Sequence, residues 1–389
     1  MSTVTRSVEH LVIGGGPAGA MVALRLASAG RKVVLVEKES GPHDKVCGEF
    51  LSREAVGYLR QAGIEPLDLG AISIRTLRLS AGGKVVEAPL PFQALSLSRR
   101  ILDAALLTRA EETGVQILRG TAVESLKSEG NRWIASLGGG DSIRAPHVFL
   151  ATGKHDLRGF ARRPAKQSDL VGFKMYWRLA PAQVRKLREC MELYLFPGGY
   201  GGLSLIEGGV VNLCLVVRRA TLRSCDGWPQ VLDFILRDNH RLHLLLEGAT
   251  PLWTRPLAIS PIPYGYLIRE SGGLWCVGDQ AAVIPSFTGD GISIALHSGA
   301  LAAQMFVEGQ SAADYNRALR MQLTGPMNLA TWLSRAAVTA AGRATALAAL
   351  TLAPNAMCWV AESTRIPQSS LVSGEFLIQA AGPATRQGV

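Results

Sequence analysis

The residues best suited to chemistry begin with a glycine-rich turn near the start of the sequence. An apolar run that ends in Val12-Ile13 leads into Gly14, Gly16 and Gly19, and a helical pattern follows. Gly14 permits a tight turn, Gly16 lets a phosphate approach the backbone because it lacks a Cβ, and Gly19 allows close packing of helix on strand. The helix N-terminus adds unpaired N–H groups and a positive dipole end. The turn is therefore predicted to bind the pyrophosphate of a dinucleotide.

A carboxylate follows the next apolar run, over 33–36, and narrows the choice of dinucleotide. Glu37 stands where a carboxylate accepts hydrogen bonds from a ribose diol, and Lys38 comes directly after it. Because Glu37 would repel a 2′-phosphate, the sequence favours FAD or NAD over NADP.

A second glycine-marked constellation lies much later in the chain. Gly278-Asp279 ends an apolar strand pattern, and Gly289-Asp290-Gly291-Ile292 opens a helical one. An aspartate at the end of a buried strand can bind a ribityl hydroxyl, and N–H groups at a helix N-terminus can stabilise negative charge on a reduced flavin ring. Asp290 could instead serve only as a helix cap. Together with the first turn, the arrangement favours a flavin.

The nucleotide-binding elements come in three separated parts, near Gly14, Gly153 and Gly278. Between the last two, period-two alternation over 171–217 predicts an antiparallel sheet distinct from the nucleotide domain. The predicted fold is α/β (α+β overall): a Rossmann-like FAD-binding domain with an inserted antiparallel-sheet substrate domain and C-terminal helices. The FAD-binding domain is expected over 1–70, 98–160 and 270–310, the substrate domain over 71–97 and 161–269, and the helical region over 311–389.

Local sequence patterns predict where individual helices and strands lie. The longest apolar region, 336–361, is broken by Arg343 and Pro354, so it is predicted to form packed helices rather than a membrane span. The last residues, 379–389, are expected to be frayed. Elsewhere we expect strands over 72–79 and 84–88, and helices over 97–112, 228–246 and 291–308.

The composition excludes several function classes. The chain has 389 residues, of which 48% are hydrophobic, a formal net charge of +10 and six cysteines. Its basic residues are scattered, without the aromatic interleaving of a nucleic-acid surface, and no Cys or His spacing fits a metal site. No secretory signal pattern precedes the glycine turn, so a cytoplasmic location is expected. The positive charge leaves peripheral contact with an anionic membrane open.

These motifs together resemble a known family. The sequence is similar to the FAD-dependent oxidoreductases of the p-hydroxybenzoate hydroxylase fold, and most of all to their geranylgeranyl reductase-like subgroup. The matching segments span most of residues 1–300. They are the glycine turn with Glu37, Lys45-Val46-Cys47-Gly48-Glu49, Arg99-x-x-Leu102-Asp103, Ala151-Thr152-Gly153, and Gly278-Asp279 through Pro285 to Gly291.

The resemblance implies a role for each matching residue. Arg99 is expected to contact the FAD phosphates or ribityl chain, Val123 the adenine through its backbone, and Asp279 the ribityl-pyrophosphate region. Cys47 and its neighbours are expected beside the flavin. The cofactor-binding residues predicted in this way are Gly14, Gly16, Pro17, Ala18, Gly19, Glu37, Lys38, Cys47, Gly48, Arg99, Val123, Thr152, Gly153, Gly278, Asp279, Pro285, Gly289, Asp290, Gly291 and Ile292.

The sequence departs from the family pattern in two places. Hydroxylases of this fold usually carry Asp-Gly where this chain has Thr152-Gly153. The reductases usually carry Tyr-x-Trp-x-Phe-Pro in the substrate sheet, whereas this chain has Gly199-Tyr200-Gly201-Gly202-Leu203 nearby, without the tryptophan.

The favoured hypothesis is a flavin monooxygenase that hydroxylates a lipophilic or aromatic small molecule. NAD(P)H would be a transient reductant, because the sequence has no second dinucleotide-binding unit. One alternative is an alkene reductase that uses reduced FAD, as in prenyl-chain saturation, and another is a non-catalytic electron relay. No catalytic residue stands out, although His43, His155 and His297 are candidates by type. The side chains predicted to wall a substrate pocket are Phe173, Tyr176, Trp177, Tyr194, Phe196, Tyr200 and Phe287.

Overall fold

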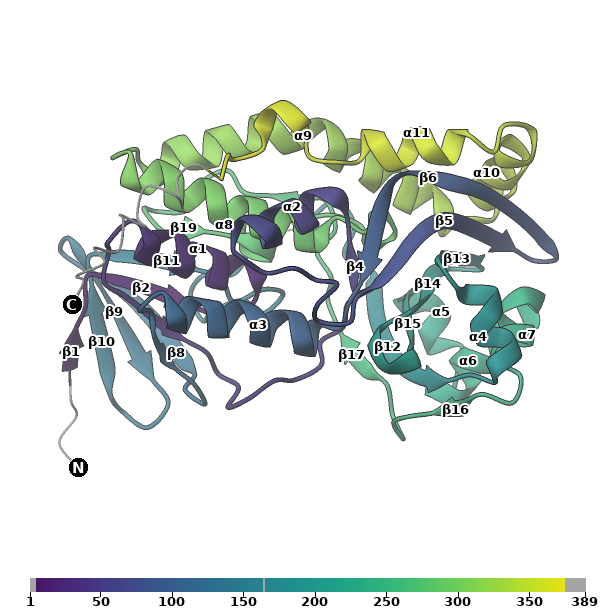
Figure 1. Cartoon of the computed structure of the whole chain (residues 1–389), viewed down its shortest axis with the longest axis horizontal. Coiled ribbons are helices and arrows are strands. Elements are labelled where there is room, and N and C mark those ends of the chain that lie inside the picture. The colour runs from purple at the N-terminus through teal and green to yellow at the C-terminus, as the bar shows by residue number, and fades with distance from the viewer. Residues whose placement is uncertain (1–4, 164, 375–389) are drawn as a thin grey trace, which may run out of the picture.

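The computed structural model describes residues 5–163 and 165–374 and contains two main sheets, each with helices packed on it (Figure 1). The first sheet is five-stranded and fully parallel, in the order β19-β11-β2-β3-β7. Its strands come from widely separated segments, which confirms the α/β nucleotide-binding architecture. They are β2 (His10–Ile13), β3 (Val33–Val36), β7 (Gln116–Leu118), β11 (His147–Leu150) and β19 (Trp275–Cys276).

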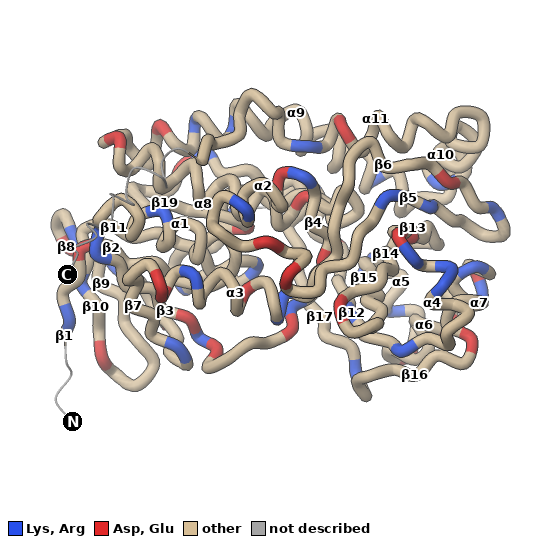
Figure 2. Tube along the Cα trace, viewed as in Figure 1, with Lys and Arg blue, Asp and Glu red and all other residues tan. Residues whose placement is uncertain are grey.

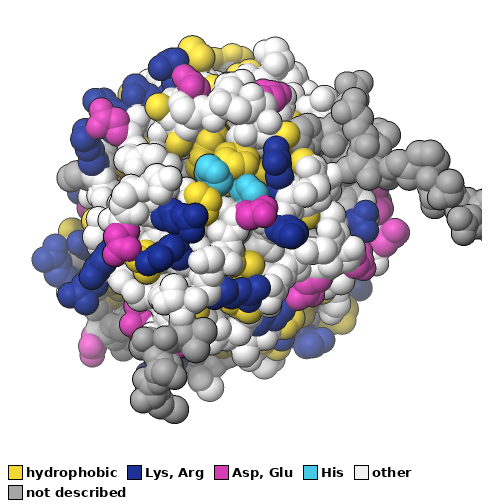
Figure 3. Space-filling view, turned by 90° about the vertical axis from the view of Figure 1, so that its left-hand side faces the viewer, with side chains coloured by type: hydrophobic (Ala, Val, Ile, Leu, Met, Phe, Trp, Pro, Cys, Tyr) yellow, Lys and Arg dark blue, Asp and Glu magenta, His cyan; other side chains and the backbone are white. Residues whose placement is uncertain are grey.

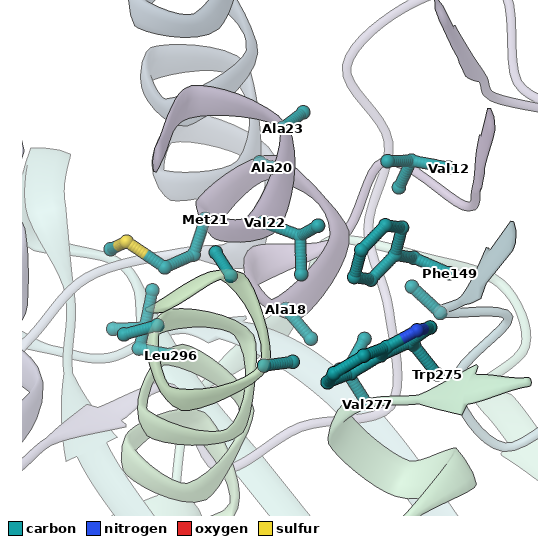
Figure 4. Close-up of a cluster of buried hydrophobic side chains, with 14 of the residues drawn as sticks. Val12, Ala18, Ala20, Met21, Val22, Ala23, Phe149, Trp275, Val277 and Leu296 are labelled. Atoms are coloured by element: carbon teal, nitrogen blue, oxygen red, sulfur yellow. The ribbon is translucent and has the colours of Figure 1, made fainter. Parts of the chain in front are cut away.

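Three helices pack on or beside this sheet: α1 (Pro17–Ser28), α3 (Arg99–Glu112) and α8 (Gly291–Val307). Figure 4 shows Met21 of α1 and Leu296 of α8 in one apolar cluster with Phe149 and Trp275 of the sheet. Helices α1 and α8 approach closely at Gly299, where a Cβ would lie only 2.5 Å from the Ala18 carbonyl oxygen. This contact fixes the two helix N-termini relative to each other.

Smaller elements complete this half of the molecule. A four-stranded sheet has the order β1-β10-β9-β8, and a two-stranded one pairs β18 with β20. Helix α2 (Arg53–Gln61) packs against α8. The strands are β1 (Thr5–Ser7), β8 (Val123–Glu129), β9 (Arg132–Leu137), β10 (Ser142–Ala145), β18 (Tyr266–Leu267) and β20 (Ala282–Val283).

The second main sheet has nine strands in the order β16-β12-β15-β14-β13-β5-β6-β4, with β17 paired to β12. All neighbours are antiparallel except β13 and β5, which are parallel. Strands β5 and β6 are longer than the sequence predicted. The strands are β4 (Phe50–Leu51), β5 (Ile72–Ala81), β6 (Lys84–Ser96), β12 (Leu170–Arg178), β13 (Cys190–Phe196), β14 (Gly199–Leu205), β15 (Val211–Arg218), β16 (Thr250–Pro251) and β17 (Leu257–Ile259).

Helices cover the two faces of this sheet differently. One face packs against α4 (Pro181–Leu187), α5 (Arg219–Arg223), α6 (Trp228–Asp238) and α7 (His240–Leu246). The sequence predicted one helix over 228–246, but it breaks at Asn239, whose Oδ1 caps α7 by accepting from the Leu242 N–H at 3.1 Å. The other face lies toward α9 (Ala312–Ala337), α10 (Ala340–Leu352) and α11 (Ala356–Ser363).

The apolar region 336–361 forms helices, as predicted: the end of α9, all of α10 and most of α11. Leu347 and Leu350 of α10 pack against the core next to the second sheet, but no residue of α10 is fully buried. Among residues 5–163 and 165–374, no single helix passes the length and hydropathy test for a membrane span, although α10 and the segment after it pass together as a pair bent by 116°. The predicted frayed end, 379–389, lies outside the described residues.

Candidate functional site

One cavity of about 1060 Å³ runs between the two main sheets and is lined mostly by apolar side chains. We call its first part the dinucleotide groove: the part lined by residues 13, 14, 16–18, 36–39, 43–50, 99, 121–123, 151–157, 277–279, 284, 286–289, 291 and 292. We call its second part the apolar arm: the part lined by β5, β13, β14, β15 and β17 on one side and by α9, α10 and α11 on the other.

The glycines of the first turn have two different structural roles. A Cβ at Gly14, whose φ is +110°, would lie 2.4 Å from the Ala151 carbonyl oxygen, and one at Gly19 would lie 1.9 Å from the Gly14 carbonyl oxygen. These two positions exclude any side chain for reasons of packing. A Cβ at Gly16 would meet only the ends of two cationic side chains, Arg99 Nη2 at 3.5 Å and Lys45 Nζ at 4.0 Å. Gly16 therefore borders open space that two cations face.

Those cations leave a net positive charge at the start of α1. Arg99 donates to both carboxylate oxygens of Asp103, at 2.7 and 2.8 Å, and Lys45 Nζ lies 3.1 Å from Asp103 Oδ2. Burial acts to raise the pKa of Asp103, but Arg99 and Lys45 outweigh it and hold that pKa below its usual value. Two cations thus share one carboxylate beside a helix N-terminus without a side-chain cap, which fits a pyrophosphate.

Glu37 lies at the carboxyl end of β3 and is buried. Its Oε2 accepts from the Gly15 N–H at 2.6 Å and its Oε1 from the Glu39 N–H at 3.0 Å. A carboxylate has about four lone-pair sites, so each oxygen retains acceptor capacity on the groove side. The geometry fits the predicted ribose contact.

The other two turns meet the first one. A Cβ at Gly278 would lie 2.9 Å from the Ala18 Cβ, and Gln280 Nε2 donates to the Gly153 carbonyl oxygen at 2.8 Å. Asp279 Oδ2 lies 2.9 Å from Lys154 Nζ. Burial acts to lower the pKa of Lys154, but Asp279 outweighs it and raises that pKa. The three turns converge, as predicted, and Lys154 adds a third cation to the groove, after Arg99 and Lys45.

The turn before α8 is held from the far end of the chain. Gly289 has φ +73°, and a Cβ there would lie 2.5 Å from Phe50. Asp290 makes no side-chain capping bond, because its Oδ1 accepts from Arg365 Nη1 at 2.5 Å, while Arg365 Nη2 donates to the Thr288 carbonyl oxygen at 2.9 Å. Burial raises the pKa of Asp290 to about 7, with Arg365 opposing it. The capping alternative for Asp290 is therefore wrong.

A buried charged group lies beside the Cys47-Gly48 segment. Glu49 has a left-handed φ of +58° and is held there because its Oε1 accepts from Lys174 Nζ, from Tyr176 OH at 2.7 Å and from the Arg99 N–H at 2.9 Å. Lys174 and Glu49 are fully buried. Burial raises the pKa of Glu49, and Lys174 opposes that rise. A non-glycine residue in this conformation is costly, so the three contacts also hold the turn in shape.

Most predicted cofactor residues line the groove, and three do not. Gly19, Pro285 and Asp290 are absent from the lining: Gly19 serves close packing, and Asp290 is buried against Arg365. The residues that do line it are Gly14, Gly16, Pro17, Ala18, Glu37, Lys38, Cys47, Gly48, Arg99, Val123, Thr152, Gly153, Gly278, Asp279, Gly289, Gly291 and Ile292. Their contact with a bound cofactor stays a prediction.

The predicted aromatic wall needs correction. Tyr200 and Phe287 line the cavity and pack edge-to-face, with ring centroids 5.7 Å apart. Phe173, Trp177, Tyr194 and Phe196 do not line it; they point to the opposite face of the sheet, into the core beneath α4–α7. Tyr176 does not line the cavity either, because its OH donates to Glu49 Oε1 and its ring packs on Trp253.

Of the three candidate histidines, two line the dinucleotide groove and one is a core residue. His43 and His155 line the groove, and burial lowers the pKa of His155. His297 is buried between Tyr58 OH, 2.7 Å from its Nδ1, and Gln322 Oε1, 2.8 Å from its Nε2. Burial lowers the pKa of His297 to about 4, so it is a neutral core residue.

Sequence reasoning missed several charged residues at the site. Lys154 directly follows the Thr152-Gly153 turn, and that position is a signal that could have identified it. Lys174 stands in an alternating strand and resembles an ordinary surface lysine, and Arg365 lies far from every motif. Only the three-dimensional arrangement reveals these two.

Comparisons with known proteins agree with this geometry. The family model for the FAD binding domain matches residues 7–144. The menaquinone reductase of Mycobacterium tuberculosis is 28% identical over 321 residues, which cover 78% of this chain and 77% of the relative. Digeranylgeranylglycerophospholipid reductase 2 of Methanopyrus kandleri is 27% identical over 321 residues, covering 79% and 78%.

The fold has solved counterparts. A geranylgeranyl bacteriochlorophyll reductase-like protein from Thermoplasma acidophilum aligns with a TM-score of 0.74 at 19% identity, over 97% of this chain and 96% of its own. These matches confirm the resemblance inferred from the motifs. The chain therefore carries an FAD binding domain over residues 7–144, and it is similar in sequence and fold to FAD-dependent oxidoreductases of the p-hydroxybenzoate hydroxylase fold, with geranylgeranyl reductases among its homologues.

Proposed function

We propose that this protein uses reduced FAD to saturate an isolated carbon–carbon double bond in a long apolar chain of the isoprenoid type. The observation that carries the proposal is the continuity of the dinucleotide groove with the apolar arm. The whole cavity, about 1060 Å³, exceeds the roughly 300–1,000 Å³ common for small-molecule sites. Such a space suits a dinucleotide together with a second, elongated molecule.

The wall of the arm favours an aliphatic substrate. Leu193 and Leu195 of β13 face it, and Gly201 of β14 adds backbone without a side chain to its wall. Across from them, Ala346, Leu350 and Met357 come from α10 and α11. These side chains offer dispersion contacts and few hydrogen bonds, so they would align a hydrocarbon chain and exclude water from it.

The residues of the groove fit FAD. Arg99, Lys45 and the start of α1 would hold its pyrophosphate, and Glu37 would hold a ribose. When bound, the flavin supplies a hydride, which the protein itself cannot provide. The electrons would come from an external reductant of the nicotinamide class.

Saturating a double bond takes one hydride and one proton, and two groups on the cavity wall can hold the proton. Burial raises the pKa of Cys214 and of Tyr200 to about 12 each, so both are protonated at neutral pH. Both line the cavity, and Tyr200 OH lies 3.1 Å from Ser334 Oγ. We propose that one of them donates the proton. Tyr200→Phe and Cys214→Ala, compared for turnover and for solvent-deuterium incorporation, identify which one.

Hydroxylation, the hypothesis favoured from sequence, is the second candidate. It is supported by the missing tryptophan of the reductase segment, because the strand concerned, β14, forms part of the cavity wall through Tyr200 and Gly201. We rank it second because the apolar arm suits an aliphatic chain and because reductases are among the similar proteins.

Oxygen dependence separates the two reactions. The protein, loaded with FAD and reduced by dithionite under strict anaerobiosis, is mixed with polyprenyl substrates, and the products are read by mass spectrometry. Alkene reduction predicts products heavier by two hydrogens in the absence of oxygen. Products that carry an added oxygen atom, formed only after air is admitted, would establish the monooxygenase instead. No conversion under either condition would favour the electron relay.

A further inference from the structure

We propose that residues 332–360, which form the end of α9, all of α10 and the first half of α11, dock on the surface of an anionic lipid bilayer. We call these residues the docking surface. The docking itself is independent of the reaction; only the view that a lipid substrate enters here rests on the proposed function. The proposal is built from exposure, from the position of the cavity mouth and from charge.

The docking surface exposes large apolar side chains that nothing in the described chain covers. Leu352 is 87% exposed, Trp332 66% and Trp359 61%. Helix α10 between them is rich in alanine and leucine and has no buried residue. Large exposed apolar side chains gathered on neighbouring helices mark a place of contact with another apolar phase.

The cavity opens at the same place. Trp332 and Trp359 are exposed and also line the cavity, as do the exposed residues Ala341 and Ala349. The mouth of the apolar arm is therefore framed by α9, α10 and α11. Tryptophan is enriched at the boundary between lipid and water, where its ring is apolar and its N–H is solvated. A bilayer is the apolar phase that would meet such a rim.

Charge selects a lipid surface of negative sign. Residues 332–360 contain two arginines, Arg335 and Arg343, and no aspartate or glutamate, and the chain carries a formal net charge of +10. Figure 2 shows α10 and α11 as mostly tan. Arg317 pairs with Asp314, and Arg343 lies near Asp238, but Arg335 is exposed close to Trp332. The opposite end of the molecule, seen in Figure 3, mixes both signs over its face.

The geometry favours lying on the membrane over crossing it. Helix α10 has 13 residues, fewer than the roughly 20 that cross a bilayer, and the chain bends by 116° after it. Helix α11 is anchored to the body of the protein, because Met357 and Ala361 are buried and Cys358 Sγ contacts the Pro89 carbonyl oxygen at 3.1 Å. The docking surface is thus a shallow apolar hairpin on a folded base, typical of interfacial proteins.

Vesicle flotation tests the proposal with the FAD-loaded protein. We expect flotation with vesicles of phosphatidylcholine and phosphatidylglycerol, weaker flotation with phosphatidylcholine alone, and a blue shift of tryptophan emission on binding. The double variant Leu352→Glu, Trp359→Glu should lose at least tenfold in vesicle affinity. Leu67→Glu is the matched control, because Leu67 is also exposed, at 46%, but lies outside residues 332–360. It should bind vesicles as the unaltered protein does.

The outcomes separate docking from the reaction. Flotation measures no turnover, so failure of the proposed reductase activity leaves its result intact. Leu352 does not line the cavity. If a substrate enters from the bilayer, Leu352→Glu alone should keep the turnover of a short, water-dissolved isoprenoid and slow that of a vesicle-embedded one. The proposal is overturned if the unaltered protein ignores both kinds of vesicle, or if the double variant floats equally well. It is also overturned if light scattering shows instead a dimer that the double variant dissociates.

Discussion

At the scale of single residues, a buried ion pair between Lys174 and Glu49 stabilises the turn beside the dinucleotide groove. Lys174 and Glu49 are both fully buried, and they form an ion pair that also takes in Tyr176 OH. Removing charges from water is costly, so such a pair is stable only while both partners are present. The pair holds the left-handed turn that follows Cys47 and Gly48 on the groove wall.

Breaking this pair from one side should be worse than removing both charges. Lys174→Met leaves the Glu49 carboxylate buried without its cation and should cost about 3–5 kcal/mol of unfolding free energy. Lys174→Met combined with Glu49→Gln should cost less than the sum of the two single changes, with a coupling of roughly 1–3 kcal/mol. Urea unfolding of the four proteins gives these values. Strict additivity would show that the two side chains do not depend on each other.

His297 predicts a specific acid sensitivity. Burial lowers its pKa to about 4 in the folded protein, whereas an unfolded histidine titrates near 6.5. The unfolded state therefore binds more protons between these values, and stability falls as the pH falls from about 6.5 to about 4. The loss should approach about 3 kcal/mol. His297→Gln can keep both hydrogen bonds, and its stability, followed by thermal unfolding from pH 7 to pH 4, should lack this component. Parallel pH profiles for the two proteins would refute the assignment.

At the scale of elements, the first glycine turn combines two functions in one motif. Gly14 and Gly19 permit α1 to pack on the sheet, whereas Gly16 faces open space beneath Arg99 and Lys45. The sequence spacing is shared, but the structural reasons differ, and substitution should separate them.

Alanine at Gly19 and alanine at Gly16 should change two different properties, the stability of the fold and the affinity for FAD. Gly19→Ala places a Cβ 1.9 Å from the Gly14 carbonyl oxygen and should destabilise the fold by about 3 kcal/mol. Gly16→Ala should fold normally but weaken FAD binding about tenfold or more, because the methyl group occupies the approach of the pyrophosphate. Thermal unfolding of the apoprotein and FAD titration measure the two effects. Gly57→Ala, where a Cβ meets nothing within 4 Å, is the control. Unchanged FAD affinity in Gly16→Ala would mean that the phosphates lie elsewhere.

Sequence patterns predicted some elements well because those elements are local. Helix α8 ends at Val307, one residue before the predicted end at 308, and the three turns that the motifs identified do meet in space. The prediction of an aromatic wall around the substrate pocket was wrong for a physical reason. Alternation divides Phe173, Tyr194 and their neighbours between two faces, but it does not say which face a helix layer will cover. Here α4–α7 cover the aromatic face, and the cavity face carries leucine and glycine.

The long-range ion pairs could not be predicted from the sequence either. Arg365 reaches Asp290 and the Thr288 carbonyl oxygen from the bend that follows α11, near the end of the described chain. Nothing in its neighbourhood in the sequence marks it. Tertiary packing alone joins the C-terminal helices to the turn that precedes α8.

For the molecule as a whole, the two sheets and the C-terminal helices form one continuous path. The path begins at the glycine turns, passes between the sheets and ends at the docking surface. A cofactor at one end and a lipid at the other would meet inside it, and the helices that frame its mouth also anchor the turn before α8 through Arg365.

The most direct test blocks this path. Ala346 lines the apolar arm on α10, away from every residue expected to hold FAD, so Ala346→Trp should fill the arm and leave FAD affinity unchanged. The measurement is the rate at which a polyprenyl substrate reoxidises the protein-bound reduced flavin without oxygen. We predict rapid reoxidation in the unaltered protein and a rate at least tenfold slower in Ala346→Trp. Equal rates in the two proteins, or no reoxidation until oxygen is admitted, would contradict the account.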